Sequence, residues 1–241
     1  MAWRSSARAR ACRCRDSLRG DELMANEPDE TSLREQLAAQ YRHVERIGLN
    51  QLSSGNLSVR WGEKMLISAS GATADSIAAD NVVEVSLRGA WQGRLKPSSE
   101  WRMHAAIYSR HAAAQAVVHT HSDHCVALAS HGRALPGFHY LVGTFGGDDV
   151  PCVPYSTFGT TQLADDAAAA LTHRTACLLA NHGMIARGRS LQEAVEHAHR
   201  LEILCRQYLL ARQLGEPAHL TAAEWEEFFK QLRGSGYGQA P

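Results

Sequence analysis

The sequence lacks three features that would each point to a particular class of protein. It has no excess of either charge, because 25 Lys and Arg balance 25 Asp and Glu, and a neutral chain is not expected to bind duplex nucleic acid. It has no apolar run near the ~18 residues that cross a bilayer, which predicts a soluble protein with no membrane partner. Its six cysteines are scattered without a CxxC pair, so we expect reduced thiols and a cytoplasmic location.

Histidine, by contrast, is abundant, with 13 residues. Imidazole is the commonest metal ligand and the usual proton carrier near neutral pH, so this number favours metal chemistry.

The length of 241 residues is typical of one domain. The first two dozen residues are rich in arginine and lack periodicity. We interpret residues 1–27 as a disordered leader, or as translated sequence upstream of a true start at Met24, with an organellar transit peptide as the alternative. Residues 28–241 are then expected to form a single catalytic domain with a mobile C-terminal tail.

Helical and strand patterns alternate along this domain. Ser32 and Glu35 form a capping-box pattern at the start of the first helix, Gly48 is expected to end it, and Thr221 with Glu224 caps the last one. Interleaved helices and strands, with several strands adjacent in sequence, predict an α/β fold: a three-layer α/β/α domain with a central, mostly antiparallel sheet. The expected helices span 32–47, 99–111, 122–130, 160–171, 191–213 and a segment from 221; the expected strands span 56–60, 65–68, 82–87, 116–121, 139–142, 150–154, 176–180 and 184–186.

A histidine pair stands at the end of the predicted strand 116–121. Side chains two apart on a strand share a face, with Cα atoms ~6.6 Å apart, so His119 and His121 can converge on one ion. His182 follows another apolar strand and precedes Gly183, which we expect to allow a sharp turn. Three histidines would leave a coordination position open for substrate, as a catalytic site requires. His104, one turn after Glu100, is expected to pack or to form hydrogen bonds.

The same letters permit a second interpretation. Residues 119–124 read HTHSDH and match the HxHxDH run of metallo-β-lactamase-fold hydrolases, in which Asp123 and His124 would bind a second metal. Small glycine-type residues usually follow that run, whereas an apolar helix follows it here.

Five short blocks occur in the order typical of the class II aldolase/adducin family, which the chain resembles from about Leu33 to about Tyr237. The blocks are Ser54-Gly55-Asn56-Leu57-Ser58, Ile67-Ser68-Ala69-Ser70-Gly71, Lys96-Pro97-Ser98-Ser99-Glu100-Trp101-Arg102, Val118-His119-Thr120-His121 and Asn181-His182-Gly183. Together with residues 150–160, they are most similar to the branch that acts on L-fuculose 1-phosphate.

The resemblance implies a Zn²⁺ site of His119, His121 and His182, with Glu100 as the fourth ligand until substrate displaces it. Mn²⁺ and Co²⁺ remain alternatives, because imidazole suits all three ions. Glu100 would then act as the general acid/base while the metal acts as a Lewis acid on the ketone of a sugar phosphate. No lysine Schiff base is required, which is consistent with a chain that has only three lysines.

The resemblance also implies a phosphate site rich in hydroxyl groups and backbone N–H groups, which suit an anion at turns and helix starts. Turn formation and helix capping are the alternative interpretation of these residues. The residues are Gly55, Asn56, Ser70, Gly71, Ser98 and Ser99.

Two tyrosines receive roles from the resemblance. Tyr140 aligns with a tyrosine that protonates the aldehyde oxygen across a subunit interface, and Tyr237 resembles a lid residue of the C-terminal tail. Packing in an interface or core is the alternative for Tyr140. Contacts between neighbouring subunits imply a homotetramer with sites at its interfaces.

The expected reaction is the reversible cleavage of a ketose 1-phosphate into dihydroxyacetone phosphate and a short aldehyde. L-Lactaldehyde is the nearest analogy, while acetaldehyde or glycolaldehyde would come from pentulose 1-phosphates. The alternatives on the same metal site are an epimerase, a dehydratase or a decarboxylase. An adducin-like binding module without catalysis is the alternative of another class.

Overall fold

The computed structural model describes residues 29–235 of the chain, and the predicted leader and Tyr237 lie outside this range. Helices and strands alternate as expected over most of it. The helices are α1 (Glu30–Arg46), α2 (Trp101–Arg110), α3 (Asp123–Ala129), α4 (Thr161–Ala170), α5 (Leu191–Ala211) and α6 (Ala222–Ser235), with 3-10 turns η1 (Ala79–Asn81), η2 (Tyr140–Phe145) and η3 (Arg212–Leu214). The strands are β1 (Asn56–Trp61), β2 (Lys64–Ser68), β3 (Val82–Ser86), β4 (Ala116–Thr120), β5 (Cys152–Val153), β6 (Ala176–Leu179) and β7 (Gly183–Gly188).

The strands form one sheet in the order β3-β2-β1-β4-β7-β6-β5. Five neighbouring pairs are antiparallel, and β5 and β6 are parallel. Antiparallel neighbours need only short connections, such as residues 62–63 between β1 and β2, whereas a parallel pair needs a crossover, which α4 provides here. The prediction of a mostly antiparallel sheet is confirmed.

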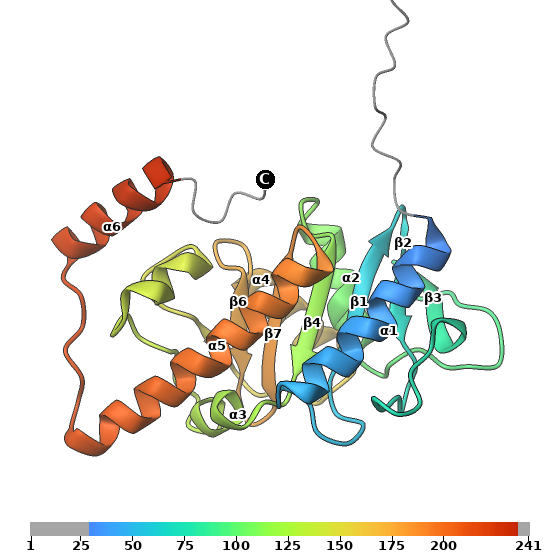
Figure 1. Cartoon of the computed structure of the whole chain (residues 1–241), viewed down its shortest axis with the longest axis horizontal. Helices are drawn as coiled ribbons and strands as arrows, with labels where there is room; N and C mark the ends of the chain where they lie inside the picture. The colour runs from blue at the N-terminus through green and yellow to red at the C-terminus, as the bar shows by residue number, and fades with distance from the viewer. Residues whose placement is uncertain (1–28, 236–241) are drawn as a thin grey trace, which may run out of the picture.

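Helices cover both faces of the sheet, and α1 and α5 cross one face in the foreground of Figure 1. Alternate residues of β4 enter opposite cores: Val118 packs in the core formed with α1, α3 and α5, and Val117 in the core formed with α2 and α4. This period of two follows from strand geometry. The predicted three-layer α/β/α architecture is therefore confirmed, and the odd-numbered positions of β4 face α2.

The two terminal helices begin differently from one another. For α1 the predicted cap is wrong, because Asp29 accepts the hydrogen bond from the Ser32 backbone N–H at 2.8 Å and the helix starts at Glu30. For α6 the prediction is confirmed, since Thr221 and Glu224 hydrogen-bond to each other's backbone N–H. Asp and Ser are both favourable N-cap residues, and Asp29 takes the position that the pattern assigned to Ser32.

The strand predicted over 139–142 is wrong, because residues 140–145 form the 3-10 turn η2. The His139 ring accepts a hydrogen bond from the Leu141 backbone N–H at 3.2 Å, which starts the turn. Gly143 packs so closely on Phe228 of α6 that a Cβ there would lie 2.2 Å from that ring. The apolar run is thus buried against a helix. The strand predicted over 150–154 is reduced to β5, preceded by a single bridge between Val150 and Leu135.

Glu202 of α5 caps the first turn of α3. Its carboxylate accepts hydrogen bonds from the backbone N–H groups of His124 and Cys125 at 3.1 and 3.0 Å, and from the His124 ring at 2.6 Å. Burial raises the pKa of Glu202, but these hydrogen bonds lower it by more than burial raises it. The pKa of Glu202 in the folded protein is therefore below its ordinary value. The ionised carboxylate therefore stabilises the fold.

We expect Glu202→Gln to lower the free energy of unfolding by about 1–3 kcal/mol at pH 7, because an amide cannot accept from both N–H groups. Since the folded-state pKa is depressed, the contribution is complete above the ordinary Glu pKa of about 4.3 and is lost as pH falls through the folded-state value. Denaturant unfolding of both proteins at pH 7 and at successively lower pH, down to about pH 3, measures it. A difference between the two proteins that stays constant or grows in acid would contradict this account.

Among the described residues, no helix combines the length and apolarity that a membrane crossing requires.

Candidate metal centre and active site

Glu100, His119, His121 and His182 converge at one point, and their nearest ligand atoms all lie within 4.8 Å of one another. The three imidazole centroids are 4.8–4.9 Å apart. Glu100 Oε2 lies 3.0 Å from His119 Nε2, and Glu100 Oε1 lies 3.2 Å from His182 Nε2. A group of three imidazoles and one carboxylate within this distance could hold a divalent cation.

Two neighbouring strands bring the histidines together. His119 lies on β4, and His121 follows two residues later on the same face, toward α2. His182 lies in the turn between β6 and β7, where Asn181 adopts the left-handed conformation with φ 55°. Gly183 does not make the turn that we predicted for it; it provides space against β4, because a Cβ there would lie 2.4 Å from the Thr120 carbonyl oxygen. Its missing side chain lets β7 approach β4 closely enough to bring His182 beside His121.

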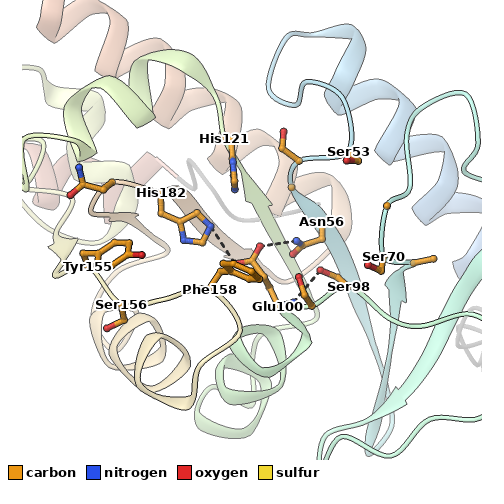
Figure 2. Close-up of a pocket in the computed structure, with 16 residues that line it drawn as sticks. Ser53, Asn56, Ser70, Ser98, Glu100, His121, Tyr155, Ser156, Phe158 and His182 are labelled. Carbon is orange, nitrogen blue, oxygen red and sulfur yellow. Dashed lines mark hydrogen bonds and ion pairs between the residues drawn. The ribbon is translucent and has the colours of Figure 1, made fainter.

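Hydrogen bonds fix two of the ligand groups. The His119 Nδ1 donates to the Met184 carbonyl at 2.8 Å, which turns Nε2 toward Glu100. Such an outer contact orients a metal-binding imidazole and fixes its tautomer. Glu100 immediately precedes α2, and the Asn56 amide donates to its Oε2 at 3.1 Å, as Figure 2 shows.

The electrostatics of this group favour positive charge at its centre. Burial raises the pKa of Glu100, but His119 and His182 outweigh it and hold this pKa well below its usual range. Burial lowers the pKa of His119, while Glu100 raises it and prevails. Burial, with His119 and His182 nearby, lowers the pKa of His121 to about 4, so its ring is neutral at pH 7 and can act as a ligand.

A cation fits this arrangement. The Nε2 atoms of His119 and His121 lie 3.0 Å apart, a contact between two lone pairs unless a proton or a metal ion lies near both. Glu100 Oε1 is buried and lies 3.2 Å from His182 Nε2, yet it accepts no hydrogen bond within residues 29–235. Both observations are explained by an ion that both imidazoles and the carboxylate share, and the donor set matches that of a catalytic zinc site.

The cluster forms part of the wall of a pocket. All six residues predicted for phosphate binding line this pocket, beside Glu100, His121 and His182. In Figure 2 Ser70 and Ser98 lie on one side of Glu100, and Tyr155, Ser156 and Phe158 on the other. The pocket is therefore polar at one end and has aromatic side chains at the other.

Three residues of the polar end also have a packing role or a hydrogen bond with Glu100. Gly55 has φ +79°, and a Cβ there would lie 2.2 Å from Asn50 Oδ1, so only glycine fits beside this buried amide. The Asn56 side chain donates to Glu100, while the Ser98 hydroxyl accepts from the Glu100 backbone N–H at 3.3 Å.

The aromatic end was missed by our sequence interpretation. Tyr155 and Phe158 are 61% and 64% exposed although both are large, and both line the pocket. The signal was present in the sequence, because both belong to the block 150–160 that resembles the family. Nothing in a stretch without periodicity indicates which side chains face a cavity.

Tyr140 lies apart from the pocket lining of its own chain. It is 52% exposed on η2, its ring stacks on His139, and it borders a groove with Phe228 of α6. The structure therefore does not bring Tyr140 to Glu100 within one described chain.

The hydrolase interpretation requires Asp123 and His124 at the metal. Asp123 instead accepts a hydrogen bond from Gln51, and His124 pairs with Glu202. Neither belongs to the cluster of metal-binding groups found among the described residues, and the fold is of another type. This alternative is wrong.

Comparison with known proteins identifies the family. The model of the "Class II Aldolase and Adducin N-terminal domain" matches residues 35–209. The chain is 43% identical over 205 residues to a 5-methylthioribulose-1-phosphate/5-deoxyribulose-1-phosphate aldolase of Rhodospirillum rubrum, covering 85% of this chain and 93% of that protein. It is 39% identical over 179 residues to the L-fuculose phosphate aldolase of Escherichia coli K12, covering 74% and 83%.

A solved structure of an L-fuculose 1-phosphate aldolase superposes with a TM-score of 0.79 at 32% identity, covering 83% of this chain and 96% of that one. The predicted nearness to the fuculose branch is thus only partly supported, since the Rhodospirillum relative is more similar. The predicted enzyme class, a carbon–carbon lyase of the aldolase type, is confirmed, because the relatives are aldolases. From the matched domain, the relatives and the shared fold, we conclude that this chain belongs to the class II aldolase and adducin family.

Proposed function

We propose that the chain is a zinc-dependent aldolase that reversibly cleaves a ketose 1-phosphate into dihydroxyacetone phosphate and a short aldehyde. The observation that supports this most is the convergence of Glu100, His119, His121 and His182 in a pocket whose other end is formed by serines and glycines. Hydroxyl groups and backbone N–H groups bind a phosphate without net positive charge. The pocket thus offers an anion site next to the cation site.

The bound cation would supply Lewis-acid polarisation of the substrate ketone. His119, His121 and His182 would hold it, with Glu100 in the position that substrate takes over. Three imidazoles and a carboxylate suit Zn²⁺ well, and Mn²⁺ and Co²⁺ accept the same donors.

Cleavage of a ketose 1-phosphate between its third and fourth carbons needs two proton transfers. The hydroxyl on the fourth carbon loses its proton to become an aldehyde, and the third carbon gains a proton to complete dihydroxyacetone phosphate. We assign the second transfer to Glu100, because Asn56 holds one of its oxygens while the other lies 3.2 Å from His182 Nε2 and accepts no hydrogen bond among the described residues. A positioned carboxylate of this kind acts as general acid/base.

We propose that Tyr140 serves the first transfer in a neighbouring subunit of a homotetramer. Its exposed ring and its distance from its own pocket lining support this role, because a partner can reach an exposed side chain. Closed symmetric assemblies are the usual form of soluble oligomers.

For Tyr140→Phe we expect kcat to fall roughly tenfold, less than the 10²–10⁴ of an essential acid or base because water can replace an exposed hydroxyl. Co-expression with Glu100→Gln should restore activity, since about one quarter of sites in randomly mixed tetramers combine an intact Glu100 with an intact neighbouring Tyr140. Mixed oligomers that show only the mean of the two single variants would contradict a shared site.

The aromatic end of the pocket supports a substrate with an apolar terminus. Tyr155 and Phe158 would contact the methyl group of 5-deoxyribulose 1-phosphate or L-fuculose 1-phosphate, or a methylthio group. Such a pocket distinguishes substrates by one methyl or hydroxyl group only ~10- to 200-fold. Free Cys125, Cys152, Cys177 and Cys205 support a reducing location such as the cytoplasm.

The experiment that tests this function is a turnover panel of the purified protein, with metal analysis of the same sample. The panel contains 5-deoxyribulose 1-phosphate, L-fuculose 1-phosphate, 5-methylthioribulose 1-phosphate and ribulose 1-phosphate, whose terminus is a hydroxyl. We expect release of dihydroxyacetone phosphate, fastest from a substrate with an apolar terminus. A metal-loaded protein that releases none from any of the four would refute the proposal.

A further inference from the structure

His104 lies one turn beyond Glu100 on α2 and is fully buried. It does not belong to the metal cluster or to the pocket lining among the described residues. Burying an imidazole is costly unless both of its nitrogens find partners. Its partners therefore indicate what this side chain does.

Both ring nitrogens are hydrogen-bonded within a buried chain of side chains. His104 Nε2 lies 2.6 Å from Asn56 Oδ1, and Asn56 Nδ2 lies 3.1 Å from Glu100 Oε2. On the other side, His104 Nδ1 lies 2.7 Å from Ser58 Oγ, which lies 2.7 Å from the Tyr108 hydroxyl. This hydrogen-bond chain runs along one face of α2, from Tyr108 to the Glu100 carboxylate.

The carboxylate determines the direction of these hydrogen bonds. An ionised carboxylate only accepts, so Asn56 must present its NH₂ group to Glu100. The Asn56 carbonyl oxygen then faces His104, and Nε2 must carry the proton. Burial, with His119 nearby, lowers the pKa of His104 to about 3, so the ring is neutral and Nδ1 accepts from Ser58. Each donor in this hydrogen-bond chain therefore points toward Glu100.

We propose that His104 is a positioning residue, which holds the Asn56 carbonyl so that the amide NH₂ stays directed at Glu100 Oε2. Without the His104 donor, the Asn56 side chain is free to rotate about its χ angles, and Glu100 loses its only side-chain amide donor among the described residues. The inference deepens the proposed function and rests on it, because Glu100 carries the proton in that reaction. Outer hydrogen bonds of this kind typically change activity by about 10- to 100-fold.

Two substitutions separate positioning from packing. His104→Met keeps the volume and removes the donor, whereas His104→Gln keeps an N–H group near the position of Nε2. We expect His104→Met to lower kcat by about tenfold or more with KM changed by less than about threefold, and His104→Gln to recover most of the loss. A loss confined to KM, or equal losses in both variants, would overturn the proposal.

His197 provides the matched control. It is also a buried histidine, but its Nδ1 donates to the Arg187 carbonyl and its helix, α5, covers the opposite face of the sheet. His197→Met should therefore leave kcat unchanged while disturbing a core to a similar degree. A similar fall in kcat for His197→Met would mean that loss of any buried histidine has this effect, and would overturn the proposal.

A double-substitution cycle that combines His104→Met with Asn56→Ala tests whether His104 and Asn56 act through one hydrogen-bond chain. We expect His104→Met to have little further effect on kcat once Asn56 is replaced, because coupled residues are not additive. Fully additive effects of the two substitutions on kcat would contradict a shared hydrogen-bond chain. If His104→Met does not fold, Ser58→Ala removes the partner of His104 Nδ1 and should lower kcat several-fold. An unchanged kcat in this variant would contradict the hydrogen-bond chain.

A crystal structure of the zinc-loaded His104→Met variant, beside one of the unaltered protein, provides a test that does not depend on activity. We expect the Asn56 amide to lie within hydrogen-bond distance of Glu100 in the unaltered protein and to be rotated away in the variant. An Asn56 that keeps its place in the variant would overturn the proposal. A protein with this geometry but no aldolase activity would instead refute the proposed function alone.

Discussion

Replacing Glu100 by Gln is expected to lower kcat by on the order of 10³-fold while the protein still binds one metal ion per chain. The carboxylate is 6% exposed and accepts from Asn56, and its second oxygen lies 3.2 Å from His182 Nε2. A glutamine fits the same space and can still coordinate through its carbonyl oxygen, but it cannot exchange a proton at neutral pH. Steady-state kinetics and metal analysis of one preparation measure both quantities.

Glu202→Gln is the matched control for this change, because Glu202 is also a largely buried carboxylate whose contacts are to α3. At a temperature where this variant stays folded, its kcat should equal that of the unaltered protein. Undiminished turnover of Glu100→Gln with one metal per chain would remove Glu100 from the chemistry.

Replacing His182 by Ala is expected to weaken metal binding by more than about 100-fold, because even the loss of an outer partner of a ligand costs about 10- to 100-fold. The side chain approaches Glu100 Oε1 at 3.2 Å from the turn between β6 and β7. Without it, three of the four groups remain, and their mutual positions no longer enclose an ion. Competition with a zinc-binding dye measures the affinity.

His124→Ala is the control for the metal measurement, since His124 lies three residues from His121 but outside the cluster. It should retain one tightly bound metal per chain. If His182→Ala also retained one ion with unchanged affinity, the third imidazole ligand would have to be another residue.

The sequence predicted those parts of the site that depend on local periodicity. The period of two in β4 places His119 and His121 on the same face as Val117, and the structure brings both to one point. His182 was expected beside them because an apolar strand precedes it. The reason given for Gly183 was wrong, because the backbone reversal lies at Asn181 and Gly183 provides space against β4.

Contacts between segments far apart in the sequence could not be predicted in this way. Asn56, Ser58 and His104 form one hydrogen-bond chain because Asn56 and Ser58 of β1 point to the face of the sheet that α2 covers, and their separation of 46–48 residues from His104 carries no periodic signal. The segment 139–142 was misjudged for a similar reason. Its apolar residues suit a strand, but they pack against α6, which lies more than 80 residues later.

The most direct test of the metal site is a titration of metal-free protein with Zn²⁺ during turnover of a ketose 1-phosphate with an apolar terminus. If Glu100 and the three histidines hold the ion that the reaction needs, kcat should rise in proportion to bound zinc and stop rising at one ion per chain. Full turnover by the metal-free protein would contradict this.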